Sequence, residues 1–217
     1  MLAQLDTRLK RTLPNARIEA IQLPGCHGMR LGLINADFPT GPLDAEVMHA
    51  VILEPAYWAF CWGSGLALAA LLLEQPHWVA GKRVLDLGSG SGVAGIAAAM
   101  AGARAVTACD TDPDARLATE TNAVLNDVEI RVIDRLETGN DLILMADVLY
   151  DEQNLPLLEA ARRHAQQVLV ADSRITELPD PGYREIARIR ALTYPNLGEF
   201  DEYNTAHVFH FGSRRRK

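Results

Sequence analysis

A segment running from Val84 to Gly95 joins an apolar run, a carboxylate and a glycine-rich turn. It reads Val-Leu-Asp-Leu-Gly-Ser-Gly-Ser-Gly-Val-Ala-Gly, with Asp86 two residues before the first glycine. The apolar run is typical of a strand buried on both faces, and Gly88, Gly90 and Gly92 allow the backbone to turn sharply and approach a ligand. This order predicts a strand, a turn and a helix that together form a nucleotide-cofactor pocket.

The glycine spacing by itself fits two kinds of cofactor. Residues 90–95 satisfy the pattern G-x-G-x-x-G, which presents a helix N-terminus to a pyrophosphate in dinucleotide-binding proteins. A carboxylate at Asp86 would repel a pyrophosphate and attract a cation, so we infer S-adenosylmethionine, which carries an ammonium and a sulfonium. The alternative is that Asp86 accepts hydrogen bonds from backbone amides of its own turn.

A second acidic residue follows the next predicted strand. Asp110 comes eighteen residues after Gly92, and a carboxylate near this offset commonly holds a ribose diol because it can accept from both hydroxyls. Asp112 precedes Pro113 and is expected to cap the following helix. Asp110 is therefore the candidate for cofactor binding, with a purely structural role as the alternative.

Four aromatic residues crowd into six positions before the first core strand: Tyr57, Trp58, Phe60 and Trp62. An aromatic wall beside a sulfonium would gain about 0.5–2 kcal/mol from cation–π attraction. For the first three, packing in the core is an equal alternative. Trp62 precedes a Gly-Ser-Gly turn that opens the next helix, so we expect its ring to face the ligand.

An apolar strand that ends in Asp147 carries the candidate catalytic group. Its carboxylate is expected at the pocket rim, and Tyr150, three residues later, can reach the same rim. An amine that accepts a methyl group must lose a proton first. Asp147 could orient the ammonium, and Tyr150 or water could share the proton path. The alternative is that Asp147 caps the helix that follows.

The elements that must position these residues alternate between strand and helix. This rhythm predicts an α/β, doubly wound, mainly parallel sheet. A less regular N-terminal extension, residues 1–50, is expected to cover one edge of the domain formed by residues 51–217. The predicted strands are 82–87, 104–110, 128–133, 141–147, 166–172, and a closing pair near 186–194 and 207–211. One predicted helix begins at Gly63, and three others span 92–102, 113–126 and 151–164.

Composition narrows the possible partners. The 217 residues are 48% hydrophobic with a net charge of −7, which disfavours a nucleic-acid substrate because phosphate binding needs clustered Lys and Arg. No signal peptide or membrane-spanning run is evident, so we expect a cytoplasmic protein. Three cysteines and six histidines show no metal-ligand spacing. The basic run 214–217 is expected to be a solvated terminus.

Taken together, the motifs resemble a known family. The glycine motif, Trp62 with its Gly-Ser-Gly turn, and the D-x-x-Y motif of Asp147 and Tyr150 are similar to those of seven-β-strand lysine methyltransferases, in particular those that modify the electron transfer flavoprotein β subunit. The resemblance runs from about residue 57 to 211 and implies a class I methyltransferase fold with an antiparallel last strand. It also implies that Trp62, Gly88, Asp110 and Ala146 contact S-adenosylmethionine.

Two departures bear on the methyl acceptor. The relatives usually carry Trp-Pro-Gly-Gly where this chain has Trp62-Gly63-Ser64-Gly65, and a proline after the acid where it has Asp172-Ser173. The sequence therefore predicts an N-methyltransferase that favours protein lysine, with a small amine as an alternative acceptor. An NAD-binding redox protein and a non-catalytic cofactor-binding module are the alternatives outside this class. The number of methyl groups transferred and the oligomeric state stay open.

Overall fold

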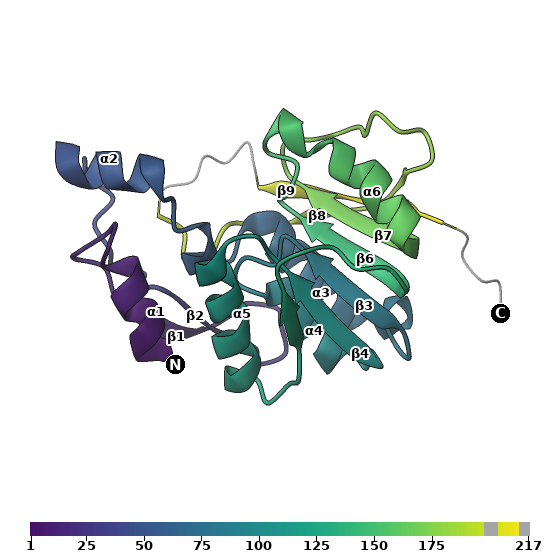
Figure 1. The fold of residues 1–217 in the computed structure, drawn as a ribbon, viewed down its shortest axis with the longest axis horizontal. Helices are drawn as coiled ribbons and strands as arrows, with labels where there is room; N and C mark the ends of the chain where they lie inside the picture. Colours follow the sequence, from purple (N-terminus) through teal and green to yellow (C-terminus); the bar gives the residue numbers. More distant parts are fainter. Residues whose placement is uncertain (198–203, 213–217) are drawn as a thin grey trace.

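The computed structural model describes residues 1–197 and 204–212. Figure 1 shows a central twisted sheet with helices on its two faces and an N-terminal segment packed at one side. The basic run at 214–217 lies outside the described residues. Across the described ranges, no helix combines the length and apolar character needed to cross a membrane.

The central sheet has seven strands within the described residues, in the order β5-β4-β3-β6-β7-β9-β8. Strands β3 to β7 are parallel to one another, whereas β9 runs antiparallel to both β7 and β8. The strands are β3 (Arg83–Leu87), β4 (Ala105–Cys109), β5 (Arg131–Ile133), β6 (Asn140–Ala146), β7 (Ala165–Asp172), β8 (Arg184–Arg190) and β9 (Thr205–Phe211).

Helices connect these strands and cover both faces of the sheet. They are α3 (Gly63–Glu74), α4 (Val93–Met100), α5 (Pro113–Leu125) and α6 (Pro156–His164), with single 3-10 turns η1 (Tyr57–Ala59), η2 (Pro76–Trp78) and η3 (Glu152–Asn154). Helix α5 begins as the sequence predicts, because Asp112 Oδ1 accepts from Asp114 N at 2.8 Å and Pro113 occupies the first turn. Helix α6 is shorter than expected, since η3 precedes it.

Side-chain alternation along β3 divides the core into two layers. Val84 packs in a cluster with α3 and α4, while Leu85 and Leu87 pack with α6 on the opposite face. The same alternation continues in β6, where Leu142 and Ile143 belong to opposite clusters. Strands that are buried on both faces in this way are typical of doubly wound folds. The predicted fold class is confirmed.

The N-terminal segment is more regular than its prolines suggested, so the prediction of an irregular extension was wrong in this respect. It contains α1 (Leu2–Leu9), an antiparallel hairpin of β1 (Ile18–Gln22) and β2 (Arg30–Ile34), and α2 (Ala45–Leu53). The predicted boundary at residue 50 falls inside α2. The regularity comes from tertiary contacts: Leu5, Leu9 and Ile34 are fully buried against α5 residues of the main domain.

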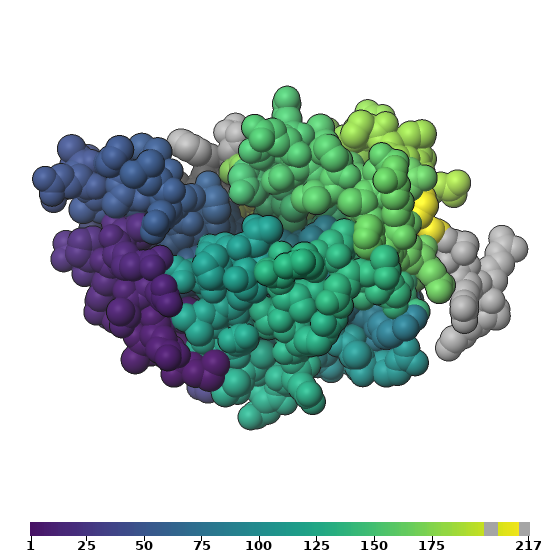
Figure 2. Space-filling view, viewed as in Figure 1, coloured from purple at the N-terminus to yellow at the C-terminus, as the bar shows by residue number. Residues whose placement is uncertain are grey.

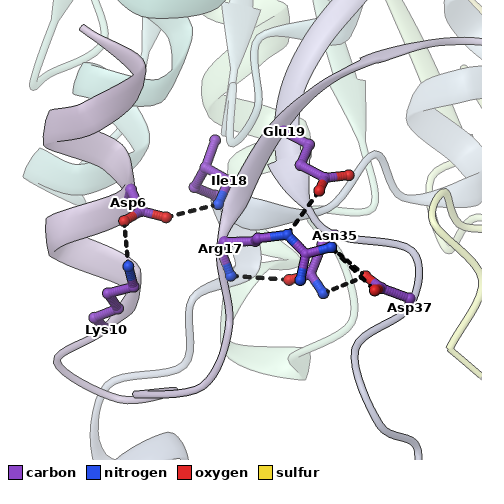
Figure 3. A network of polar contacts seen from close by, with 7 residues as sticks. All are labelled: Asp6, Lys10, Arg17, Ile18, Glu19, Asn35 and Asp37. Atoms are coloured by element: carbon purple, nitrogen blue, oxygen red, sulfur yellow. Dashed lines mark hydrogen bonds and ion pairs between the residues drawn. The ribbon is translucent and has the colours of Figure 1, made fainter.

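A polar network fixes the start of this hairpin (Figure 3). Asp6 on α1 accepts from Ile18 N at 2.9 Å and from Lys10 Nζ at 2.6 Å. Arg17 forms paired bonds to Asp37, at 2.8 and 3.0 Å, and a third to Glu19. Because the ion pairs of this network are largely solvent-exposed, their contribution to stability is modest.

The hairpin is joined to α5 by two asparagines. Asn122 Oδ1 accepts from Gly32 N at 2.7 Å, and its Nδ2 donates to Ser91 O at 2.8 Å. Asn126 brackets Arg30 in the same way, accepting from its N–H and donating to its carbonyl. Asn122 therefore connects the N-terminal segment directly to the glycine turn after β3.

The N-cap of α4 provides a stability test. Gly92 has φ +82°, and a Cβ there would lie 3.0–3.1 Å from Thr119, including its Cα. Gly102 has a similar φ of +88° but open space around it. We expect Gly102→Ala to cost about 1 kcal/mol from backbone strain alone and Gly92→Ala to cost about 1–3 kcal/mol more because of overpacking. Urea denaturation of both variants measures this; equal losses would contradict the packing role of Gly92.

Candidate functional site

A pocket of about 510 Å³ opens at the carboxyl ends of the parallel strands. It lies where the strand order reverses, between β3 and β6, which is the usual ligand position in open α/β sheets. In Figure 2 the segment before α3, helix α5 and the segment after β6 meet around a hollow in the surface. The lining residues divide into two halves. The residues that follow β3 and β4 form the first half, and the residues that follow β6 and β7 form the second half.

The glycine turn after β3 forms the floor of the first half. Gly88 and Gly90 line the pocket and have φ values of +73° and +51°. A Cβ on Gly88 would lie 2.7 Å from Val148 Cγ2, so the turn and the β6 loop are in close contact. The structure thus places these two predicted residues in the pocket.

Asp86 does not line the pocket. Its side chain points to the α3–α4 face of the sheet, where Oδ2 accepts from Gly95 N at 2.9 Å, and the residue is 2% exposed. Burial raises the pKa of Asp86 to about 7, because its effect is larger than the opposing effect of the hydrogen bond from Gly95. The prediction that this carboxylate faces the ligand was wrong because strand alternation turns residue 86 toward α4. The observed geometry matches the alternative given above, in which Asp86 accepts a hydrogen bond from a backbone amide.

Gly92 also lies outside the pocket lining. It caps α4 and packs against Thr119. The structure therefore gives Gly92 a conformational role in starting the helix and does not place it in the pocket with Gly88 and Gly90.

Asp110 follows β4 and lines the pocket, as predicted. Its Oδ2 accepts from Gly90 N at 2.9 Å, and its Oδ1 accepts from Asp112 N at 3.0 Å. Burial raises the pKa of this carboxyl, and the two backbone bonds oppose the shift. The side chain links the two turns that follow β3 and β4, and each oxygen retains a further lone pair for a ligand hydroxyl.

Asp147 lines the second half of the pocket, and its carboxylate accepts hydrogen bonds from a helix that is distant in sequence. Its Oδ1 accepts from Ser64 Oγ at 2.5 Å, and its Oδ2 accepts from Ser64 N and Gly65 N at 2.9 and 3.3 Å. A carboxylate at a helix N-terminus is stabilised by the exposed amides and the helix dipole. Asp147 therefore caps α3, whereas the sequence offered only capping of the following helix as the alternative.

This cap is held in a strained backbone conformation. Asp147 has φ +53°, which costs a non-glycine residue of order 1–3 kcal/mol unless the surroundings fix it. Burial raises its pKa to about 6, the Ser64 hydroxyl lowers it, and the charge of nearby Asp172 raises it again. The strain and the buried charge are both offset by the three bonds to α3.

An aromatic wall borders the mouth of the pocket. Tyr57, Trp62 and Tyr150 all line it, with ring centroids 5.8 Å apart for Tyr57 and Trp62 and 5.6 Å apart for Tyr57 and Tyr150. Trp62 Nε1 donates to Tyr57 O at 2.9 Å, which fixes the indole. Of the other two aromatics, Trp58 is buried yet reaches the lining, whereas Phe60 packs against Trp62.

Ala146 lines the pocket as predicted, but several other lining residues were missed. Asp172, Ser173 and Arg174 at the end of β7 form one group, and Asn154 and Leu157 after β6 form another. Asp172 ends an apolar strand as Asp147 does, and this signal could have identified it. The residues of the second group carry no sequence signal, because they reach the pocket through the fold of η3 and α6.

Comparisons with known proteins identify the architecture. A family model described as "Ribosomal protein L11 methyltransferase (PrmA)" matches residues 64–152. The crystal structure of a ribosomal protein L11 methylase from Lactobacillus delbrueckii subsp. bulgaricus superposes with a TM-score of 0.51 at 24% identity, covering 68% of this chain and 77% of that one. The fold is that of a class I methyltransferase.

Sequence relatives extend this similarity. An "Electron transfer flavoprotein beta subunit lysine methyltransferase" from Danio rerio is 40% identical over 159 residues, covering 68% of this chain and 62% of the relative. A homologue of that name from Caenorhabditis elegans is 28% identical over 203 residues, covering 77% of this chain and 83% of the relative. The resemblance to the electron transfer flavoprotein β-subunit lysine methyltransferases is therefore confirmed. The chain spans between 39% and 62% of the length of the vertebrate relatives it matches.

The buried carboxyl of Asp86 under α4 should make the stability of the protein depend on pH. Asp86 keeps its proton up to about pH 7 in the folded protein, whereas an unfolded aspartate loses it near pH 4. Between these values the folded state binds more protons, so wild-type stability falls as pH rises. Asparagine cannot ionise. We expect Asp86→Asn to gain stability relative to wild type from pH 4 to pH 8, by at most about 4 kcal/mol.

Urea denaturation of both proteins across this pH range measures the difference. The two curves should lie closest at pH 4, where Asp86 is protonated in the folded state. A difference that does not vary with pH would show that Asp86 titrates near its ordinary pKa.

Proposed function

We propose that this chain is an S-adenosylmethionine-dependent N-methyltransferase whose favoured acceptor is a lysine of another protein. The observation that carries the proposal is the pocket itself: a crevice at the topological switch point, floored by glycines, walled by aromatic rings and bordered by carboxylates. The relatives named as lysine methyltransferases support the same class of reaction.

The residues present fit S-adenosylmethionine in size and charge. A volume of about 510 Å³ lies within the range of small-molecule sites. Gly88 and Gly90 leave the floor without side chains, and Asp110 lies where it can accept from a ribose diol. Trp62 and Tyr57 offer aromatic faces to a cation. We therefore assign the cofactor to the β3–β4 half and extend it to Ala146.

The acceptor side is assigned to the β6–β7 half. When bound, the cofactor would supply an electrophilic methyl group and leave as the neutral thioether S-adenosylhomocysteine. The acceptor ammonium must release one proton to solvent to expose its lone pair, and the negative charge of this half favours the cation before that step. Asp147 fixes α3 and with it Trp62, so its catalytic effect is alignment. Tyr150, at 52% exposure, borders the entrance.

The geometry disfavours a dinucleotide in the same place. A pyrophosphate needs free amides at the glycine turn, yet Gly95 N donates to Asp86 and Gly90 N donates to Asp110. Arg174 is the one Lys, Arg or His among the pocket-lining residues in the described ranges, and it lies on the β7 side. An anionic phosphate would thus meet the Asp110 carboxylate at a turn where it requires free donors.

A protein acceptor is favoured over a small amine by exposed apolar side chains that shortly precede the pocket wall in the chain. Ile52 and Leu53 at the end of α2 are 68% and 67% exposed, and Tyr57, a few residues later, is 46% exposed and lines the pocket. Large apolar side chains left exposed on a protein surface are often part of a protein-binding site. The relatives' names supply the first acceptor to test, the electron transfer flavoprotein β subunit, with ribosomal protein L11 as the second.

Cofactor binding tests the first step of this proposal. We expect S-adenosylhomocysteine to bind wild type in calorimetry, and Asp110→Ala to weaken binding about 10- to 100-fold because the hydrogen bonds of a charged group are lost. Glu120→Ala, which removes an exposed acid of α5 outside the pocket lining, serves as the control and should leave affinity unchanged. Failure of wild type to bind the nucleoside would reject the proposed function.

Methyl transfer tests the acceptor. Incubation with radiolabelled S-adenosylmethionine and purified electron transfer flavoprotein should label its β subunit, and mass spectrometry of the digested band should place the label on lysine. Label on ribosomal protein L11 or on free amines only would redirect the proposal to those acceptors.

A further inference from the structure

Two carboxylates lie side by side at the ends of neighbouring parallel strands. Ala146 and Ala171 are paired in register, and Asp147 N donates to Ala171 O at 3.1 Å, so Asp147 and Asp172 follow adjacent positions of β6 and β7. Both line the pocket. Their proximity is also evident in the pKa of Asp147, which the charge of Asp172 raises.

The two side chains differ in what they can still bind. Both oxygens of Asp147 accept from the first turn of α3. Asp172 accepts through Oδ1 only, from Arg174 N at 2.8 Å and Ile175 N at 3.1 Å. Its Oδ2 has no hydrogen-bond donor among residues 1–197 and 204–212. Asp172 therefore presents the one oxygen of this pair that lacks a partner in the described structure.

Asp172 Oδ2 keeps access to the pocket, because it is not among the buried unpaired side-chain atoms of the described residues. Asp172 is 2% exposed, and burial raises its pKa despite the opposing backbone bonds. Arg174, two residues later, and His207, opposite on β9, favour its charged form, although His207 Nδ1 lies 2.8 Å from Glu185. In such largely desolvated surroundings, a charged donor that reaches the open oxygen binds more strongly than it would in water.

We propose that Asp172 Oδ2 accepts a hydrogen bond from the ammonium of the methyl acceptor, and that the β7 end of the pocket is the acceptor-amine site. This inference rests on the proposed function and refines it. An ammonium supplies three N–H donors and a positive charge, which match one open carboxylate oxygen beside the second negative group of Asp147. Asp147 then acts as a positioning residue, through α3, and Asp172 contacts the substrate.

Sinefungin provides a probe that does not require the natural acceptor. This nucleoside carries an amine-bearing carbon in place of the methylated sulfonium, so it places an ammonium at the point of methyl transfer, whereas S-adenosylhomocysteine places none there. We expect wild type to bind sinefungin about tenfold more tightly than S-adenosylhomocysteine, and Asp172→Asn to remove most of this preference, as expected for one charged hydrogen bond.

Three variants separate the contact from structural effects. Asp172→Asn can keep the turn bonds from Arg174 and Ile175, and its affinity for S-adenosylhomocysteine should stay within about twofold of wild type. Asp172→Ser, which can also accept from its own turn, is the second variant and should lose the preference equally. Asp180→Asn is the matched control, since Asp180 Oδ1 accepts from Gly182 N in a similar turn outside the pocket, and it should keep the preference.

The outcomes distinguish this inference from the proposed function. If wild type binds neither nucleoside, the proposed function fails and the inference fails with it. If both bind but wild type shows no preference for sinefungin, or Asp172→Asn keeps it, the inference alone is wrong. If instead Asp147→Asn removes the preference while keeping S-adenosylhomocysteine affinity, the acceptor contact belongs to Asp147. Equal weakening of both nucleosides by Asp147→Asn supports its positioning role.

Discussion

The bond between the end of β6 and the start of α3 is the interaction on which the pocket depends. Asp147 binds the hydroxyl and amide of Ser64 and the amide of Gly65, which α3 cannot satisfy internally. Trp62 immediately precedes this turn, and its indole is held by Tyr57 O. One carboxylate thus connects the switch-point strand to the aromatic wall.

This connection explains why a strained, partly buried aspartate occupies the end of β6. Its φ of +53° and raised pKa are both unfavourable, and three hydrogen bonds at a helix N-terminus offset them. An asparagine would accept fewer of these bonds and carry no charge. The aspartate of the D-x-x-Y motif therefore joins β6 to α3 in this molecule.

Carboxylates at four strand ends have distinct tasks because each meets different neighbours. Asp86 is turned under α4, Asp110 links two turns, and Asp147 caps α3. Asp172 serves its own turn through one oxygen and leaves the other to the pocket. Residue type at the end of a parallel strand thus marks the region of the site, while the nearest backbone amides decide which group remains available to a ligand.

The sequence by itself determined the doubly wound fold, the glycine turn and the region of the pocket. These depend on local signals: apolar runs, the glycines, and Asp112 with Pro113 at the start of α5. It could not determine the hydrogen-bond partners of Asp86 and Asp147, because each partner is an amide of another element, nine or more residues away in the chain. The regular N-terminal hairpin and the position of Asp172 beside Asp147 were likewise decided by tertiary contacts, since packing against α5 and pairing of β7 with β6 are not encoded in any short segment.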